Sequence, residues 1–374
     1  MSNHEQSFMP DWLIHPGEHL AEYLEAYEMS QAELAERTGL HRKTINDIIK
    51  GRASITPETA LLLEPVFARP AHFWMNLDRQ YHEGLARQAR KQLIEAQAQW
   101  VKRFPLKEMR QRGVIPHTHD VHATGVALLA FFGVGTIDAW HTVWHQDPLP
   151  VTYRQQRNET RTPELLSVWL REGQHAVEHR ECQPFDAAKL RESIPLLRQL
   201  TTQTPAEFWP TLETVCANAG VCVVQVAPYP KLAVYGAIYR YRGKTVVQVS
   251  NHRRTVDQFW FTFFHEVGHL LLHGIKDYYI EGEHAELHAT DEQEREADAF
   301  ATRTLIPEGA WNTYVHRTQR AVREHGVPYQ LADIERFADQ QKIDVSIVIG
   351  RLQHESHLPY RSPLSSHKRA LVWE

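Results

Sequence analysis

The sequence predicts a mainly α-helical protein with a small β-sheet, built of three parts in chain order. Apolar residues at helical spacing fill most of the chain, and runs of β-branched residues lie between residues 221 and 250. One helix-length stretch, residues 255–274, is apolar around nearly its whole circumference. We expect a five-helix bundle over residues 1–95, a helical connector over 96–205, and an α+β domain with a C-terminal helical extension over 206–374.

Composition bounds the class of protein. The 374 residues are 42% hydrophobic and 23% charged, which is typical of a folded chain of two or three domains. The net charge of −5 indicates that any DNA contact must come from a local patch. The three cysteines, Cys182, Cys216 and Cys222, form no disulfide framework. With no secretion signal and no apolar run long enough to span a bilayer, we expect a cytoplasmic protein.

The N-terminal part contains two short helices joined by a glycine turn. The second expected helix is capped by Ser30, with Glu33 three residues on, and it ends at Gly39. The third runs from about residue 41 to residue 50. This pair is typical of a helix-turn-helix. Other helices of the bundle are expected after Pro16, from Thr56 and from Pro70.

The third helix is predicted to enter the DNA major groove with its N-terminal residues facing the bases. Five basic residues and one acid lie between residues 37 and 52, which makes a local positive patch. A helical protein-interaction bundle with an ordinary solvated face is the alternative. The side chains expected to reach bases or phosphates are Gln31, Arg42, Lys43, Thr44, Asn46 and Lys50.

Further short motifs extend over residues 15–81. They are His15-Pro16-Gly17, Ser30-Gln31 with Leu34-Ala35, Lys50-Gly51-Arg52, Thr56-Pro57-Glu58-Thr59-Ala60, and Phe73-Trp74-x-Asn76-Leu77. Together they resemble the Xre-type helix-turn-helix of the HigA/VapI antitoxins. That resemblance implies a homodimer that binds double-stranded operator DNA, commonly beside a RelE/HigB-like toxin.

The connector shows no readable chemistry. We expect a long polar helix over residues 82–112, then an apolar helix, a loop over 145–165, and two more helices near 163–179 and 186–200. His175 and His179 lie four residues apart, so a second metal pair is conceivable. They lack a carboxylate context and buried apolar flanks, and we therefore prefer a structural role for them.

The C-terminal part mixes helices and strands. Its central helix, 255–274, is expected to begin with a capping box of Thr255 and Gln258 and to end at Gly274. A helix capped by Thr290 ends at Pro307. The other expected elements are a helix over 206–219, a strand over 221–227, a hairpin of 233–241 with 244–250, a loop over 275–289, and helices near 317–325, 330–342 and after Asp344.

The central helix carries polar residues where its pattern predicts burial. Burying His265, Glu266 and His269 without partners would cost several kcal/mol, about the cost of an unpaired polar group. The two histidines lie four apart on one helix face, in the His-Glu-x-x-His arrangement in which both bind zinc and the glutamate activates a water. Two core histidines bonded to the backbone are the alternative. The apolar flanks favour the metal.

A hydrolytic zinc keeps three protein ligands and one open position, so a third ligand must come from elsewhere. The helix after Thr290 has an apolar stripe that includes Ala297 and Ala301. Glu296 borders that stripe and is the acid predicted to face inward. The acids expected to point further toward solvent are Glu292, Glu294 and Asp298.

Two segments between residues 230 and 310, HEVGHLLLHG and EREADAFATRTLIP, resemble the ImmA/IrrE metallopeptidase family. The resemblance implies a zincin-like fold and one zinc ion per chain, held by His265, His269 and Glu296, with Glu266 as general base. Asp298 stands where asparagine is common in that family, and we expect little consequence from this difference. Candidates for stabilising the oxyanion are Tyr235, Tyr239, His252 and His273, although a structural role is preferred for each.

These patterns leave two functions open. In the first, a DNA-bound regulator uses its zinc site to hydrolyse a peptide bond in a repressor, a toxin or itself. In the second, the protein is an antitoxin-type repressor whose zincin domain binds a toxin or senses a signal with little catalysis. The presence of Glu266 favours the first function, because a fold kept only for binding does not need it. A purely structural zinc is disfavoured by the open fourth position.

Overall fold

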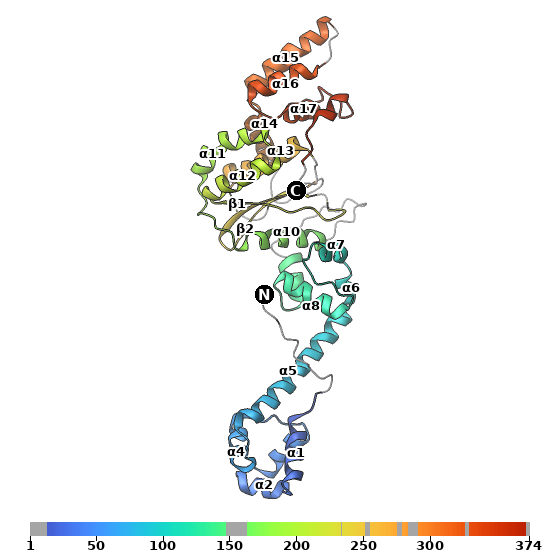
Figure 1. The fold of residues 1–374 in the computed structure, drawn as a ribbon, viewed down its shortest axis with the longest axis vertical. Helices are drawn as coiled ribbons and strands as arrows, with labels where there is room; N and C mark the ends of the chain where they lie inside the picture. The colour runs from blue at the N-terminus through green and yellow to red at the C-terminus, as the bar shows by residue number, and fades with distance from the viewer. Residues whose placement is uncertain are drawn as a thin grey trace. The chain divides into compact units, whose positions relative to one another are not determined.

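The computed structural model describes residues 13–146, 163–232, 234–250, 255–274, 279–282, 291–325 and 329–371. By internal contacts the chain separates into two compact units, Met1–Ala98 with Asp120–Gly125, and Gln99–His119 with Val126–Glu374. The predicted class, mainly α-helical with a small sheet, is confirmed (Figure 1). The division into three parts at residues 95 and 205 stays a prediction.

The first unit is the predicted helical bundle. Its core holds one or more side chains from every helix, and Leu20, Leu34, Ile45, Leu63 and Trp74 are all fully buried there. The turn between the second and third helices contains Gly39 at a φ of 72°, a conformation that favours glycine. The helices are α1 (Pro16–Ala26), α2 (Gln31–Thr38), α3 (Arg42–Ile49), α4 (Pro57–Phe67) and α5 (Ala71–Ala96).

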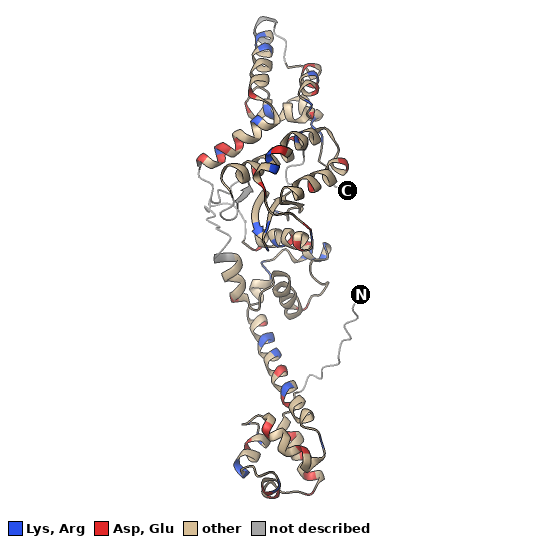
Figure 2. Cartoon of the chain, turned by 90° about the vertical axis from the view of Figure 1, so that its left-hand side faces the viewer, with Lys and Arg blue, Asp and Glu red and all other residues tan. Residues whose placement is uncertain are grey.

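Helix α5 differs from the predicted polar helix over residues 82–112. The fifth helix of the bundle and the start of the expected polar helix 82–112 form one continuous helix that stops at Gln97. Two short helices follow, α6 (Ala98–Val101) and α7 (Leu106–Gln111), and Pro105 directly precedes α7, where a proline is tolerated. Charged residues of both signs line α5 (Figure 2), and some form i,i+4 ion pairs that support a solvated helix.

The helices after α7 confirm most of the middle-region elements. The expected loop 145–165 lies largely outside the described residues. Among the described residues, no single helix is long and apolar enough to cross a membrane, although α8 and the following segment to Trp144, bent by 42°, pass that test as a pair. The elements are α8 (Val121–Phe132), α9 (Ile137–His141), η1 (Thr142–Gln146), α10 (Pro163–Glu178), α11 (Ala187–Gln199), η2 (Leu200–Thr202) and α12 (Pro205–Asn218).

The sheet has four strands in the order β1-β3-β2-β4. The predicted hairpin is confirmed as β2 (Val234–Tyr241) and β3 (Lys244–Val249), which pair antiparallel, and β1 (Val221–Gln225) pairs parallel to β3. The fourth strand, β4 (Tyr279–Gly282), lies where a loop was expected. Pairing with β2 rather than local propensity makes this segment a strand, so the sequence pattern did not reveal it.

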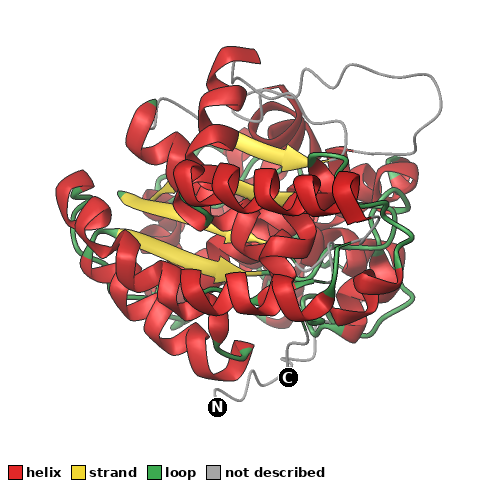
Figure 3. Cartoon of the chain, turned by 90° about the horizontal axis from the view of Figure 1, so that it is seen from above, coloured by secondary structure: helices red, strands yellow, loops and turns green. Residues whose placement is uncertain are grey.

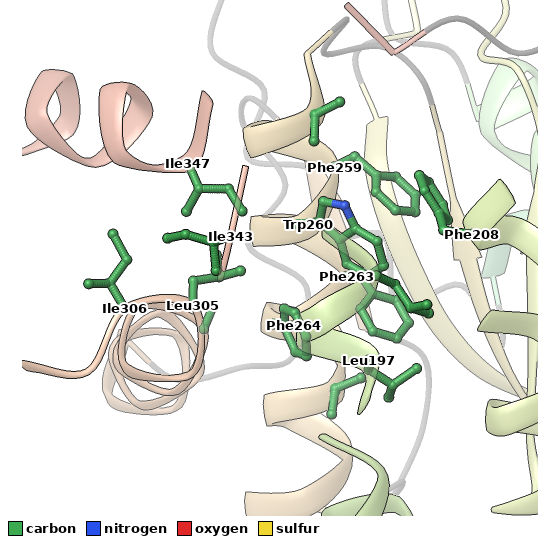
Figure 4. Packing of buried hydrophobic residues seen from close by; sticks show 14 of the residues in the cluster. Leu197, Phe208, Phe259, Trp260, Phe263, Phe264, Leu305, Ile306, Ile343 and Ile347 are labelled. Atoms are coloured by element: carbon green, nitrogen blue, oxygen red, sulfur yellow. The ribbon is translucent and has the colours of Figure 1, made fainter. Parts of the chain in front are cut away.

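Helices cover both faces of the sheet (Figure 3). On one face α10 is fixed by side-chain hydrogen bonds, because the indole of Trp169 donates to the carbonyl of Val226 (2.8 Å) and Gln248 donates to the carbonyl of Trp169 (2.7 Å). The other face packs on α12 and on α13 (Val256–Leu272). Figure 4 shows aromatic side chains of α13, such as Trp260, between Phe208 of α12 and Leu305 near the C-terminal helices.

The ends of α13 differ in part from expectation. Thr255 is the N-cap residue, but its side chain makes no cap hydrogen bond, so the predicted capping box is wrong. A backbone bridge from Thr255 to Ala370 joins the helix start to the C-terminal segment instead. Gly274 follows the helix with a φ of 70°, as predicted. The remaining elements are α14 (Asp291–Leu305), α15 (Glu308–His325), α16 (Leu331–Gln341), α17 (Val345–His354) and η3 (Pro363–His367).

Candidate metal centre and DNA-facing surface

Helix α13 carries its polar triplet deep inside the second unit. His265, Glu266 and His269 are 3%, 1% and 2% exposed, and aromatic neighbours on the same helix surround them in the largest core. The two imidazole planes are inclined at 76° to each other, with 2.9 Å between their Nε2 atoms. Both Nε2 atoms therefore point at the same small region beside the helix.

The third residue at this region is Glu294. Its Oε2 lies 3.2 Å from Nε2 of His265, and its Oε1 lies 3.4 Å from Nε2 of His269. Within the described part of the chain, these three residues form the group of histidine and acidic side chains that could hold a metal ion. Tetrahedral zinc with bonds of about 2.0–2.1 Å places its ligand atoms about 3.3 Å apart. The donor set fits zinc in both spacing and chemistry.

The predicted third ligand, Glu296, lies elsewhere. Its carboxylate is 2.8 Å from Nε2 of His273, and its side chain is 55% exposed. The helical period explains the difference, because Ala297 and Ala301 are fully buried against α13 and the same stripe continues three residues back to Glu294. Glu296 precedes Ala297 by one residue and so leaves the helix in another direction.

The electrostatics of the triad suit a cation. Burial opposes the charge of Glu294, but the adjacent imidazoles of His265 and His269 outweigh it and hold the pKa of that carboxyl at about 2. Burial lowers the pKa of His269, because the imidazolium form is poorly solvated there. An ionised carboxylate beside a neutral imidazole is the protonation state that a divalent metal requires.

A second layer of side chains contacts the two imidazoles. Asp298 Oδ1 lies 2.9 Å from Nδ1 of His265. Nδ1 of His269 lies 3.1 Å from Nδ1 of His273, whose Nε2 meets Glu296. The aspartate at residue 298, where asparagine is common in the ImmA/IrrE family and where we expect little consequence, therefore contacts His265, a predicted metal ligand, directly.

The carboxylate of Glu266 lies toward the sheet and not within the metal group. A Cβ atom added at Gly236 of β2 would lie 2.5 Å from Oε1 of Glu266 and 3.1 Å from Cγ2 of Thr262. Only glycine lets the strand approach the helix so closely here. The sequence did not single out Gly236, because only the pairing of β2 and α13 reveals its role.

The candidates for the oxyanion group separate in the structure. The hydroxyl of Tyr239 donates to Gln248 (2.7 Å) on the α10 face of the sheet, away from Glu266. Tyr235 lies at a bulge between β2 and β4, directly before Gly236, and stays a candidate. His252 lies outside the described residues, and His273 belongs to the second layer.

The other histidine pair does not form part of a metal group among the described residues. Nε2 of His175 lies 3.0 Å from the carbonyl of Phe131, and its Nδ1 lies 3.4 Å from Glu178. His179 is exposed. The structural role preferred for this pair agrees with these contacts.

Helix α3 of the first unit presents the predicted DNA-facing residues. Ile45 and Ile48 are buried in the bundle, which turns the opposite side of α3 outward. Arg42, Lys43 and Lys50 are exposed and have no ion pair among the described residues. The half-buried members of the predicted set are Gln31, Thr44 and Asn46.

Other cations of the same region are neutralised within the unit. Arg52 contacts Asp47 at 2.6 Å, and Arg37 contacts Glu33 at 2.5 Å. The free positive charge of the patch therefore concentrates on the exposed side of α3. The assignment of individual DNA contacts stays a prediction.

Comparison with known families separates the same two regions. Residues 20–71 match the family described as helix-turn-helix, and residues 221–335 match the family described as IrrE N-terminal-like domain. The second match includes the sheet, the group of His265, His269 and Glu294, and α15. The N-terminal and C-terminal parts of the chain therefore match different families.

Curated relatives match the N-terminal part. Virulence-associated protein I of Dichelobacter nodosus is 37% identical over 76 residues, which cover 20% of this chain and 70% of the relative. The uncharacterized HTH-type transcriptional regulator YbaQ of Escherichia coli is 38% identical over 58 residues, or 16% of this chain and 51% of the relative.

A solved structure is similar over the same region. The Pseudomonas aeruginosa antitoxin HigA, solved with the higBA promoter, is 36% identical with a TM-score of 0.22, over 23% of this chain and 94% of that chain. From the family matches and the curated relatives, the chain belongs to the Xre-type helix-turn-helix proteins and carries an IrrE-like peptidase-family domain in its C-terminal part.

Proposed function

We propose that this protein is a DNA-binding regulator whose IrrE-like domain is a zinc-dependent peptidase. The observation that carries the proposal is the triad of His265, His269 and Glu294, whose donor atoms lie 2.9, 3.2 and 3.4 Å apart around one point. Three protein ligands leave a tetrahedral ion one open position, which is the arrangement of catalytic zinc. Glu266 follows the first histidine and is 1% exposed, which supports its assignment as the general base beside that position.

Each residue has a definite task in this proposal. Bound zinc supplies a Lewis acid that lowers the pKa of a water and polarises a peptide carbonyl. Glu294 remains ionised and His269 neutral near neutral pH, so neither must lose a proton to bind the ion. Glu266 accepts the proton from the attacking water and passes it to the leaving amine. Gly236 keeps the space beside its carboxylate open.

The sheet offers a place for an extended peptide. Strand β4 pairs with β2 on one side, and Glu281 of β4 is in register with Gly236, which approaches Glu266. Among the described residues, no strand pairs with the other side of β4. A substrate that adds to this edge by main-chain pairing would lie along the strand pair that contacts the general base.

The first unit supports the DNA-binding half of the proposal. Exposed Arg42 and Lys43 open α3, exposed Lys50 directly follows it, and Gln31 is the first residue of α2. A recognition helix turns such residues to the major groove. We propose binding to double-stranded operator DNA as a homodimer, and the relative named as a transcriptional regulator supports that class of function.

The peptidase proposal is tested with zinc-loaded protein and a peptide library made from a cell lysate. New peptide termini are read by mass spectrometry for wild type, Glu266→Gln and Glu292→Gln. Glu292 is an exposed acid of α14 and so serves as the matched control. We expect new termini with wild type and Glu292→Gln, and none with Glu266→Gln although its zinc is retained.

Two outcomes contradict the proposal. The first is wild-type protein that binds no zinc, because the proposed peptidase depends on that metal. Bound zinc without Glu266-dependent termini rules out the peptidase and favours the alternative function, in which the domain binds a toxin or senses a signal.

A further inference from the structure

One helix supplies three acids to the metal region at two different depths. Glu294 of α14 meets both Nε2 atoms, while Asp298 contacts Nδ1 of His265 and Glu296 contacts His273, whose Nδ1 lies beside His269. The carboxylates of Asp298 and Glu296 are both 55% exposed, whereas His265 and His269 are 3% and 2% exposed. Asp298 and Glu296 therefore lie between the buried metal group and solvent, and neither belongs to that group.

The contacts on the Nδ1 side decide which nitrogen of each histidine carries the proton. A carboxylate can only accept, so Nδ1 of His265 donates to Oδ1 of Asp298 across 2.9 Å. The neutral ring then has its lone pair on Nε2, which faces the metal position. Nε2 of the same ring lies 3.2 Å from Glu294, so the shorter Nδ1 contact with Asp298 favours the tautomer that keeps the Nε2 lone pair for a metal.

The second imidazole is set through a relay. Nε2 of His273 donates to Oε2 of Glu296 across 2.8 Å, so Nδ1 of the neutral His273 ring is an acceptor. Nδ1 of His269 lies 3.1 Å from it and must donate. The lone pair of His269 is thereby left on Nε2, on the metal side, as in His265.

We propose that Asp298 and the His273–Glu296 pair are positioning residues that hold the two metal-ligating imidazoles in the orientation and tautomer that zinc requires. The inference rests on the proposed function, since it assumes that the triad binds zinc. Partners of this kind fix the ring and raise the basicity of a histidine ligand, and their loss typically costs roughly 10- to 100-fold in metal affinity.

The direct and relayed contacts predict a graded response. Asparagine at residue 298 can still accept from His265 but has no charge, whereas alanine removes the acceptor as well. We therefore expect Asp298→Ala to weaken zinc binding more than Asp298→Asn. Glu296→Gln acts on His269 only through His273, and its effect should be the smallest of the three.

The test is a zinc competition titration of the full chain against a chromophoric chelator. The series is wild type, Asp298→Ala, Asp298→Asn, Glu296→Gln and the control Glu292→Gln, with thermal melts of the metal-free proteins to confirm equal folding. Cobalt(II) substitution adds an absorption spectrum that reports the ligand environment. We expect roughly 10- to 100-fold weaker zinc binding and a shifted cobalt spectrum for the Asp298 variants, with the control equal to wild type.

The outcomes separate this inference from the proposed function. Asp298 and Glu296 variants that bind zinc as tightly as Glu292→Gln, with an unchanged cobalt spectrum, overturn the positioning role alone. Wild type that binds neither zinc nor cobalt overturns the proposed function and the inference together. Weaker binding that is matched by an equal loss of metal-free stability also overturns the inference, because it shows a structural role.

Discussion

The two functional regions of this protein place their charges in opposite settings. On and directly after α3, the cations Arg42, Lys43 and Lys50 are exposed to solvent above a small apolar core. On α13 the polar residues lie inside the largest core, and each imidazole is held by partners from another element or the same helix. We therefore expect substitutions at the exposed cations to cost little folding stability, whereas the buried site depends on a complete set of partners.

The largest effect should come from the acid that touches both histidines. Glu294→Gln removes the charged ligand, so we expect zinc binding to fall by more than the roughly 100-fold that an outer partner can cost. Glu296→Gln should retain most of the bound zinc. Metal content after gel filtration measures both variants. Equal zinc loss in the two variants would indicate that Glu296 is also a ligand, and that the buried triad is not the complete metal site.

A core substitution should separate the stabilities of the two units. Trp260 and Ile48 are 0% and 1% exposed in different cores. Trp260→Ala should cost about 3–5 kcal/mol and Ile48→Ala about 2–5 kcal/mol of unfolding free energy, each in its own unit.

Denaturant unfolding of the full chain, followed by zinc release for one unit and by DNA binding for the other, measures this separation. We expect each variant to move one transition only. Transitions that shift together would show one cooperative core and not two.

The smallest effect is expected at the exposed surface. Arg42→Ala and Lys43→Ala should each weaken binding to a DNA fragment selected by the protein from a random pool. Each lost phosphate contact should also lower the salt dependence of log K by about one. Arg90→Ala, an exposed cation of α5, is the matched control. Unchanged DNA affinity in both α3 variants would show that DNA does not bind at this helix.

Local patterns predicted much of this structure. Caps and turns within a few residues, such as Ser30 before α2 and Gly39 after it, identified the helix-turn-helix. The apolar circumference of α13 identified a buried helix, and the spacing of His265 and His269 identified a shared face. Each of these signals arises within one helix or one turn, so the sequence displays it directly.

The remaining features depend on contacts between distant elements. Glu294 and Glu296 differ by two positions on one helix, and only the packing of α14 on α13 decides which faces the metal. Strand β4 exists because β2 pairs with it, and Gly236 matters because Glu266 lies against it. Asp298 looked like a solvent-facing acid for the same reason, since its partner is 33 residues away.

An anomalous diffraction map at the zinc edge, from crystals of the zinc-loaded protein, tests the proposed metal centre. We expect one peak within about 2.0–2.2 Å of Nε2 of His265, Nε2 of His269 and a carboxylate oxygen of Glu294. Glu266 should lie outside the ligand set. A peak ligated by Glu296, or no peak between the two histidines, would contradict the proposed metal centre.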